Sequence, residues 1–436
     1  MSTETGKHKI IVVGGGAGGL ELATKLGRKL GKRKKAEIIL IDSSRTHIWK
    51  PLLHEVAAGT LDSHENEIEY LAQAAHCHFR FRLGHMAGLD REKQEVHVAP
   101  TLNEEGEEII PERRFHYDTL IMAVGSVSND FGIPGVAEHC LFLDTTQQAE
   151  DFQKKLMESY LKAHTQKKPM DTGQLDVAIV GAGATGTELA AQLHEVSHLL
   201  NTFGLDEVEP ADIKMSIIEA ADRILPGIIP RVSAAAAVEL EKLGIEILTN
   251  ERVVEVDKKG IKTDNDHYIP ACIRVWAAGI KAPDFLKDLG LQVNGINQLV
   301  VDAHLQTSDP NIFALGDCAA CDWPGNEGDI PPRAQAAHQQ ASLLYKTVKA
   351  RLSAKPLPTF KYFDYGSLVS LGKYSTVGNL MGGIMGSIRV EGFIARSVYL
   401  SLYKMHQMAL FGPVRMAMLT LSHLFRRSVH PNIKLH

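Results

Sequence analysis

The fold is decided by residues 8–26, HKIIVVGGGAGGLELATKL, in which an apolar run leads into closely spaced glycines. Residues 8–13 are rich in β-branched side chains and predict a buried parallel strand, and the residues after the glycines predict a helix. Gly14, Gly16 and Gly19 stand between them at the spacing of a dinucleotide-binding turn. The first glycine permits the tight turn, the second lets the backbone approach a pyrophosphate, and the third lets helix and strand pack closely.

A carboxylate follows this turn at the distance that dinucleotide-binding folds use. Residues 38–42 predict a second strand, which ends at Asp42, roughly twenty residues after Gly19. We expect Asp42 to accept hydrogen bonds from a ribose hydroxyl. One glycine motif alone is weak support for nucleotide binding, because glycines gather at many strand-to-helix turns.

The same pattern occurs a second time in the chain. Residues 177–180 predict a strand, and Gly181, Gly183 and Gly186 repeat the glycine spacing. The next strand ends at Glu219, farther downstream than usual, so we expect a long helix and loop before it. A carboxylate there would repel the 2′-phosphate of NADP, which favours NAD. Two motifs in full context predict a chain that binds two dinucleotides and moves electrons between them.

Composition sets limits on the class of protein. With 436 residues and 44% hydrophobic content, the chain can form two or three domains. Its five cysteines are too few and scattered for a disulfide framework, which indicates a reducing compartment. We expect no signal peptide and no membrane-spanning helix, because the long apolar runs that these need are missing from the sequence. The basic run at residues 29–35 is short and predicts a solvated helix end, so no nucleic-acid partner is expected.

Three further segments predict strands that end in glycine or Gly-Asp. Residues 117–125 end at Gly125, a related run ends at Gly279, and a short apolar strand ends at Gly316 and Asp317. This arrangement resembles the two-dinucleotide flavoprotein reductases, in which a Gly-Asp of that form holds the ribityl chain and phosphate of FAD.

The resemblance implies the fold and its division. We expect an α/β chain with two Rossmann-like dinucleotide-binding domains, the second inserted in the first. The FAD-binding domain would comprise residues 1–130 and 290–345, and the NADH-binding domain residues 131–289. Residues 346–436 would form a C-terminal region for membrane attachment and dimerisation, and residues 166–173 a surface linker.

Many of these reductases relay electrons through a Cys-x4-Cys pair, and this chain has no cysteine in the corresponding residues 47–59. The sequence is instead similar to the type II NADH:quinone oxidoreductases, which are single-subunit respiratory enzymes that do not pump protons. The likeness is carried by KPLLHEVAAG from Lys50, by Gly181–Glu188, by the Gly316-Asp317 segment and by PRAQAAHQ at residues 332–339. It spans essentially the whole chain and is greatest to proteobacterial members.

That resemblance implies non-covalent FAD, NADH as substrate, a membrane quinone as acceptor and a homodimer. Lys50 and Ala336 join the expected cofactor-binding residues. Gln335 and Gln339 are four residues apart and share one face of a helix that begins after two prolines. Their neutral amides can bond quinone carbonyls without a charge cost, and small residues such as Ala336 permit flat rings to approach.

Glu188 is the other residue to which we assign chemistry. It follows Gly186 by two residues, near the positive end of a helix and, by the family pattern, near the isoalloxazine ring. Quinone reduction consumes two protons as well as two electrons, so a carboxyl group there could relay them. The alternative is that Glu188 complements the helix dipole in the first turn.

The C-terminal segment has an unusual charge pattern. Residues 392–436 contain six Lys or Arg and no Asp or Glu. Two amphipathic helices separated at Gly412-Pro413 are predicted, with apolar faces that include Leu402 and Met405 in the first and Val414 and Leu421 in the second. Such basic helices lie in membrane interfaces, where each cation near an anionic surface contributes about 1 kcal/mol. We therefore expect an anionic lipid surface as partner and a peripheral protein on the cytoplasmic face of the inner membrane. Packing on the protein body or in a dimer interface is the alternative.

Other features are discounted. The Cys318-Ala-Ala-Cys321 spacing stands alone and predicts no metal or redox centre, and no metal site is expected elsewhere.

Two rival functions remain. A sulfide:quinone oxidoreductase needs redox cysteines beside the flavin, and a flavin-bearing interaction protein would turn over NADH slowly. We expect NADH to reduce FAD by hydride transfer and the reduced flavin to reduce a membrane quinone.

Overall fold

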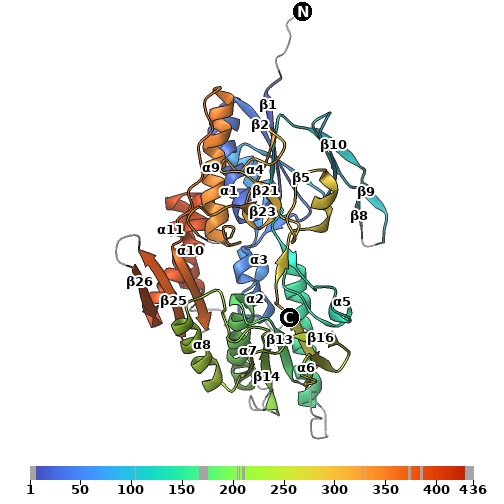
Figure 1. Ribbon diagram of the computed structural model, residues 1–436, viewed down its shortest axis with the longest axis vertical. Helices are drawn as coiled ribbons and strands as arrows, with labels where there is room; N and C mark the ends of the chain where they lie inside the picture. Colours follow the sequence, from blue (N-terminus) through green and yellow to red (C-terminus); the bar gives the residue numbers. More distant parts are fainter. Residues whose placement is uncertain are drawn as a thin grey trace, which may run out of the picture.

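The computed structural model describes residues 6–103, 105–165, 175–203, 205, 207–208, 212–326, 328–371, 375–382 and 386–427. Two lobes lie one above the other, with a C-terminal sheet and two helices along one side of both (Figure 1). The predicted linker at residues 166–173 lies outside the described residues.

The upper lobe is built on a five-stranded parallel sheet in the order β22-β11-β1-β2-β5. β1 (His8–Val13) coincides with the predicted first strand, and its apolar residues are buried. The fifth strand, β22, comes from much later in the chain than the other four. The helices α1 and α9 pack side by side on one face of this sheet (Figure 1). The bounds are β2 (Ala36–Asp42), β5 (Arg80–Leu83), β11 (Thr119–Met122), β22 (Ile312–Ala314), α1 (Ala17–Leu26) and α9 (Ala334–Leu352).

The lower lobe repeats this design with a four-stranded parallel sheet in the order β15-β14-β13-β19. The predicted strands at residues 177–180 and before Glu219 are confirmed, and both are fully buried because helices cover the sheet. The bounds are α6 (Thr146–Thr165), β13 (Val177–Val180), α7 (Ala184–Thr202), β14 (Met215–Ile218), α8 (Pro230–Lys242), β15 (Glu246–Leu248) and β19 (Ile273–Trp276).

Short elements that the sequence pattern does not predict complete the two lobes. The chain passes from the upper lobe to the lower lobe and later returns. The two crossing segments pair as a short antiparallel ladder of β12 (Val127–Ser128) and β20 (Ile280–Lys281). The others are β3 (Thr46–His47), η2 (Lys50–Leu52), α2 (Leu53–Ala57), α3 (Ser63–Asn66), β4 (Ile68–Glu69), α4 (Tyr70–Cys77), β6 (Met86–Asp90), β7 (Glu95–Val98), β8 (Thr101–Leu102), β9 (Glu108–Ile110), β10 (Arg113–His116), α5 (Val136–His139), β16 (Val253–Val256), β17 (Gly260–Thr263), β18 (Tyr268–Pro270), η4 (Asp284–Leu289), β21 (Leu299–Val301), η5 (Gly316–Cys318) and β23 (Ala319–Cys321), with the π-helix η1 (Gly27–Gly31) after α1.

The C-terminal region is an antiparallel sheet of β24 (Gly366–Leu371), β25 (Ser375–Gly382) and β26 (Gly386–Glu391), followed by α10 (Gly392–Phe411) and α11 (Pro413–Arg427). The predicted break between two helices is confirmed at Gly412, whose φ of +82° suits glycine. β24 packs against α7 of the lower lobe, and α10 packs against α1 of the upper lobe. The C-terminal region therefore contacts both lobes.

The predicted apolar face of α10 does not match the surface that packs on the body. The side chains of residues 392–400 lie outside the description. In the second half of the helix, His406, Gln407 and Leu410 are buried, while Met405 and Met408 are exposed. Two polar side chains thus face the body here, and the packing alternative applies to this part of α10. Among the helices in the described part of the chain, none combines the length and apolar character needed to cross a bilayer.

Candidate active site

The first glycine turn has the shape that a pyrophosphate requires. Gly14 has a φ of +100°, and a Cβ on Gly19 would collide with the Gly14 carbonyl oxygen. At Gly16, which precedes the first residue of α1, a Cβ would meet nothing within 4 Å. The outer glycines are thus needed for close packing, and the middle one leaves open space at a helix N-terminus. That space fits the diphosphate of a dinucleotide.

The second turn repeats this geometry. Gly181 also has a φ of +100°, and a Cβ on Gly186 would collide with the Gly181 carbonyl oxygen. Gly183 precedes the first residue of α7, and a Cβ there would again have open space around it. The two lobes therefore carry equivalent cradles, each of which fits one dinucleotide diphosphate.

The two predicted ribose-binding acids lie at equivalent places. Asp42 ends β2 and accepts a hydrogen bond of 2.5 Å from the N–H of Gly15 in its own turn. Glu219 follows β14 and accepts one of 2.8 Å from the N–H of Ala182 in the second turn. Burial raises the pKa of Asp42, against the hydrogen bonds that favour its ionised form. Both carboxyl groups thus lie against the glycine turn that each is expected to serve.

Three predicted FAD-binding residues from distant segments converge around Ser126. The Ser126 hydroxyl donates to Asp317 Oδ2 at 2.8 Å, and Lys50 Nζ donates to the Ser126 carbonyl oxygen at 2.9 Å. Lys50 also pairs with Asp144 at 3.2 Å. Gly125, with a φ of +71°, gives the chain its turn beside this cluster. The polar groups expected to hold the flavin thus share one hydrogen-bonded network.

Gly279 and Ala336 complete the predicted cofactor residues. Gly279 follows β19, has a φ of +68°, and a Cβ there would press on the Phe131 ring. Ala336 is buried in the first turn of α9. That turn lies against the upper-lobe glycines, since a Cβ on Gly18 would touch Ala337.

Gln335 and Gln339 both hold the segment of residues 363–366, which leads into β24. Gln339 accepts from the Phe363 N–H at 3.0 Å and donates to the Phe363 carbonyl at 2.8 Å. Gln335 accepts from the Tyr365 N–H and donates to both the Asp364 carboxylate and a backbone carbonyl. Both amide hydrogens of Gln335 are therefore used. Gln339 retains one amide hydrogen without an acceptor among the described residues.

Glu188 is buried where three elements meet. Its Oε1 accepts from the Ser370 N–H of β24 at 2.9 Å, and its Oε2 lies 3.6 Å from Nδ1 of His54 on α2. Burial raises the pKa of Glu188 to about 8, and the nearby charge of Glu55 acts in the same direction. Burial lowers the pKa of His54 to about 4. Glu188 is the fifth residue of α7, beyond the first turn, and this position with its raised pKa favours the proton-relay hypothesis over the helix-dipole alternative.

Some residues of this arrangement were missed by the sequence analysis. Asp364 is held by Arg333 Nη1 at 3.1 Å as well as by Gln335, and nothing in the local pattern predicts that contact. Ser370 acts through its backbone, which leaves no signal in the sequence. His54 stands inside the KPLLHEVAAG stretch, so its place in that motif was an available signal.

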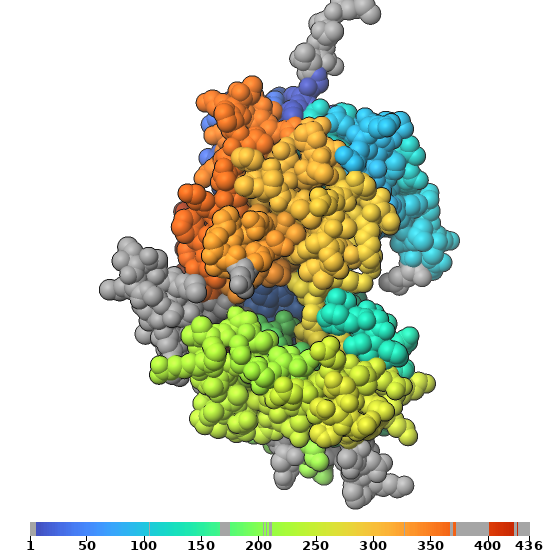
Figure 2. Space-filling model, viewed as in Figure 1, coloured from blue at the N-terminus to red at the C-terminus, as the bar shows by residue number. Residues whose placement is uncertain are grey.

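The surface is hollowed between the lobes on the face that Figure 2 shows.

The cysteines give no support to thiol chemistry. All five are free, and Cys318 and Cys321 are both buried. Burial raises the pKa of Cys318 to about 11 and that of Cys321 to about 12, so neither forms a thiolate readily. Cys318 Sγ instead contacts the carbonyls of Met122 and Leu315 within the upper core.

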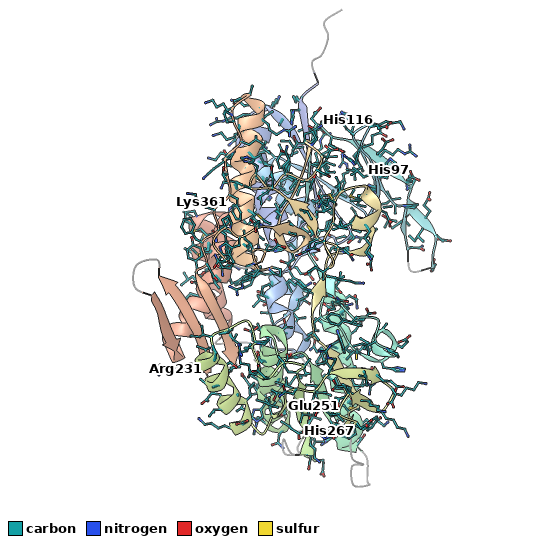
Figure 3. All side chains as sticks on the ribbon, in the orientation of Figure 1. His97, His116, Arg231, Glu251, His267 and Lys361 are labelled. Atoms are coloured by element: carbon teal, nitrogen blue, oxygen red, sulfur yellow. The ribbon has the colours of Figure 1, made fainter. Side chains whose placement is uncertain are left out.

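Three histidines that Figure 3 labels lie away from Glu188 and the two glutamines. His97 and His116 belong to the antiparallel strands of the upper lobe, and His267 pairs with Glu251 at 2.9 Å on the lower lobe (Figure 3).

Among the described residues, His64, Glu67 and Glu150 bring three possible metal-ligand atoms within 4.8 Å of one another. His64 is exposed and Glu150 accepts a bond from Ser63, and such surface groups commonly meet without an ion.

Comparisons with known proteins agree with this geometry. The family described as pyridine nucleotide-disulphide oxidoreductase matches residues 8–341. A type II NADH:quinone oxidoreductase of Haemophilus influenzae is 40% identical over 98% of this chain and 99% of its own length. The structure of NDH2 from Plasmodium falciparum in complex with NADH has a TM-score of 0.81 at 20% identity, covering 98% of this chain and 100% of that one. The sulfide:quinone oxidoreductase of Aquifex aeolicus shares the fold at a TM-score of 0.72 and 17% identity, over 97% and 96% of the chains.

Proposed function

Because the chain belongs to the pyridine nucleotide-disulphide oxidoreductases and, within them, to the type II NADH:quinone oxidoreductases, we propose that it carries electrons from NADH through FAD to a membrane quinone without pumping protons. Bound FAD supplies the redox chemistry, since it accepts a hydride equivalent and passes two electrons on. The residues of this chain bind the two nucleotides, orient the quinone and supply a proton.

The observation that carries the proposal is the position of Glu188. It belongs to the helix of the second glycine turn, yet it bonds β24, the strand that continues from the glutamine-held segment. A carboxyl group with a pKa of about 8 is protonated at neutral pH. Glu188 can therefore donate a proton where the nucleotide side and the quinone side of the molecule meet.

The nucleotide domains follow from the glycine turns. The upper lobe takes FAD, with the diphosphate over Gly16, the ribose at Asp42, and the ribityl chain and phosphate at Asp317. The lower lobe takes NADH, with Glu219 at the adenosine ribose. The return of β22 to the upper sheet after the whole lower sheet supports an insertion of residues 131–289 between residues 1–130 and 290–345.

The quinone ring is placed against the first turns of α9. Gln339 offers its unused amide hydrogen to a quinone carbonyl, while Gln335 keeps the 363–366 segment in place. Ala336 leaves room for flat rings. The side chains of Phe363 and Tyr365, which are 63% and 51% exposed, flank this position and suit an apolar quinone better than water.

The C-terminal region attaches the protein to lipid. In α11 the side chains of Val414, Met418, Leu421 and Phe425 recur at helical spacing, and each is more than half exposed. With no acidic residue after position 391, this face suits an anionic bilayer surface. We place the protein peripherally on the cytoplasmic face of the inner membrane, where its free cysteines remain reduced. A homodimer is also proposed, since the same region can contribute to an interface.

One comparison of substrates tests the function. Purified holoenzyme is supplied in turn with NADH, NADPH and sulfide, each with a short-tailed quinone, and electron-donor consumption is followed. Rapid turnover with NADH alone is expected. Turnover with sulfide would support the sulfide:quinone rival. A slow reaction that leaves a long-lived charge-transfer band after NADH addition would support a redox-gated interaction protein.

A further inference from the structure

A chain of four titratable side chains lies in the upper lobe, outside the site described above. Glu21 on α1 accepts from His338 Nδ1 of α9 at 2.6 Å and from His406 Nδ1 of α10 at 2.7 Å. His406 Nε2 is 3.0 Å from Nε2 of His47, at the end of β3. Glu21, His406 and His47 are buried, and His338 is partly exposed. One carboxylate thus connects three helices that are distant in the sequence.

Glu21 is the counterpart of Glu188 in the repeated fold. Each follows the third glycine of its turn by two residues, in the sequences GLELA and GTELA, and each is buried. Their surroundings shift their pKa values in opposite directions. Burial opposes ionisation of Glu21, but the hydrogen bonds from His338 and His406 outweigh it and keep the Glu21 pKa below its ordinary value. In the part of the chain that the structure describes, Glu188 has no pair of histidine donors of this kind, and burial is the largest influence on its pKa.

Further contacts at the same place hold the end of α10. Arg28 donates to the carbonyl oxygens of Ala409 and Leu410, and Gln73 donates to that of Leu410 at 3.2 Å. These carbonyls belong to the last turn of α10, where donors are otherwise lacking. Gly412 and α11 follow directly. The orientation of α10 on α1 therefore determines where α11 and its exposed apolar face begin.

We propose that Glu21 is a positioning residue that locks α10 onto α1 and α9, and thereby sets how a lipophilic quinone reaches the glutamine-bearing end of α9. Its partner His338 is next to Gln339, so a single carboxylate fixes both the membrane-side helix and the quinone-side helix. The part concerning quinone access rests on the proposed function; the locking of α10 does not.

The hydrogen bonds that hold α10 on α1 and α9 should weaken both in acid and in base. Protonation of Glu21 in acid removes the anionic acceptor of both histidines. Deprotonation of His338 in base removes a charged donor, since its bond to Glu21 raises the His338 pKa. Further charged groups among the described residues here are Lys25, near Glu21 on α1, and Lys346 of α9, whose charge acts on Lys25. Arg28 and Lys29 line the same pocket of about 200 Å³ with Glu21 and His338.

Hydrogen exchange of the full-length holoenzyme measures the lock directly. Glu21→Gln keeps the size of the side chain but loses the charge. A lost charge-assisted bond corresponds to about a tenfold increase in the exchange of residues 401–411, with residues 8–13 unchanged. In the wild type, protection of residues 401–411 should fall towards acid and base, and this pH dependence should be absent in Glu21→Gln. Glu69→Gln, an exposed acid of the same lobe, is the control.

Kinetics give the second readout. For Glu21→Gln in vesicles, the KM for a long-tailed quinone should rise severalfold, while kcat with the soluble acceptor ferricyanide stays at the wild-type value. Should Glu21→Gln fail to fold, His338→Gln removes one of the two bonds from a partly exposed position and should show the same changes at smaller size.

Equal exchange increases in residues 401–411 and 8–13 would overturn the proposal, because they indicate general destabilisation. So would a wild-type protection profile of residues 401–411 that is flat with pH. If Glu21→Gln increases the exchange of residues 401–411 but leaves the KM for the long-tailed quinone unchanged, Glu21 holds α10 in place. Its proposed effect on quinone access would then be wrong. Failure of the proposed function itself would appear differently, as absent quinone turnover in the wild type.

Discussion

Glu188 Oε2 lies 3.6 Å from His54 Nδ1, and both side chains are buried. Even so, both groups are mainly uncharged at neutral pH. Burial places the pKa of Glu188 at about 8 and that of His54 at about 4, so between these values the pair is neutral. The distance alone suggests an ion pair, but the burial of both side chains disfavours their charged forms. What results is a carboxylic acid that is mostly protonated at neutral pH, as the proposed donor role requires.

Replacing Glu188 with Gln should slow quinone reduction and change its pH dependence. Wild-type turnover should fall as pH rises through about 8, because the protonated acid is lost. Glu188→Gln should be about a hundredfold slower below pH 8 and show no inflection there. Steady-state NADH oxidation with a short-tailed quinone measures this, and ferricyanide reduction should be little affected. A variant with wild-type rates across pH would remove the proton-donor role.

The same substitution should stabilise the fold in mild base. The folded-state pKa of Glu188 is raised to about 8 from 4.5, so between these values the folded protein holds a proton that the unfolded chain has released. The free energy of unfolding therefore falls as pH rises through this window, by roughly 1.4 kcal/mol per pH unit at most from this group. Urea unfolding at several pH values should show a shallower decline for Glu188→Gln. Parallel curves for the two proteins would contradict the assigned protonation.

Glu219→Gln should weaken the preference for NADH over NADPH. The carboxylate lies against the second glycine turn, where a 2′-phosphate would meet its negative charge. Loss of a charged hydrogen-bond acceptor predicts a decrease of about tenfold in kcat/KM for NADH, with a smaller decrease or a gain for NADPH. Glu239→Gln, whose carboxylate pairs with Lys242 on α8, is the matched control. An unchanged ratio of the two specificity constants would exclude Glu219 as selector.

The two glutamines should differ in their effects. Gln339→Leu should raise the KM for quinone about tenfold, since it removes the available amide donor, and it should also lower stability because its two bonds to Phe363 are lost. Gln335→Leu should mainly destabilise the protein, by about 1–3 kcal/mol, because the Tyr365 N–H and the Asp364 carboxylate lose a partner. Quinone kinetics and urea unfolding of both variants separate the roles. Equal KM values for wild type and Gln339→Leu would leave both glutamines with structural roles alone.

Charges placed on α11 should release the protein from lipid. Met418→Glu combined with Leu421→Glu puts two carboxylates on the exposed apolar face, where burial in a bilayer interface becomes unfavourable. Co-sedimentation with anionic vesicles should fall by at least about tenfold, while soluble NADH:ferricyanide activity is retained. Ser353→Glu with Thr359→Glu, two exposed positions before the C-terminal sheet, adds the same charge elsewhere. Equal vesicle binding by the two double variants would indicate that α11 is not the attachment face.

Much of the fold could be predicted because its determinants are local. The apolar run before Gly14 and the run before Gly181 each form the strand expected, since a β-branched run followed by a glycine turn has few other stable conformations. The break at Gly412 could be predicted for the same reason, because glycine and the following proline end a helix. The small antiparallel sheets could not, since short strands are stabilised by partners across the sheet.

The sequence by itself determined that two glycine turns, a carboxylate after the strand that follows each turn, and an acid-free C-terminal segment occur in one chain, because each depends on residues that are close together in the chain. Only the tertiary structure decided what the buried acids do. Glu21 and Glu188 stand at the same position of the same motif. One is ionised because His338 and His406 donate to it from other helices. The other is protonated because it is buried, and among the described residues its carboxyl oxygens meet the Ser370 N–H and the His54 ring. A charge state depends on which distant groups exclude water or donate hydrogen bonds, and only folding brings those groups together.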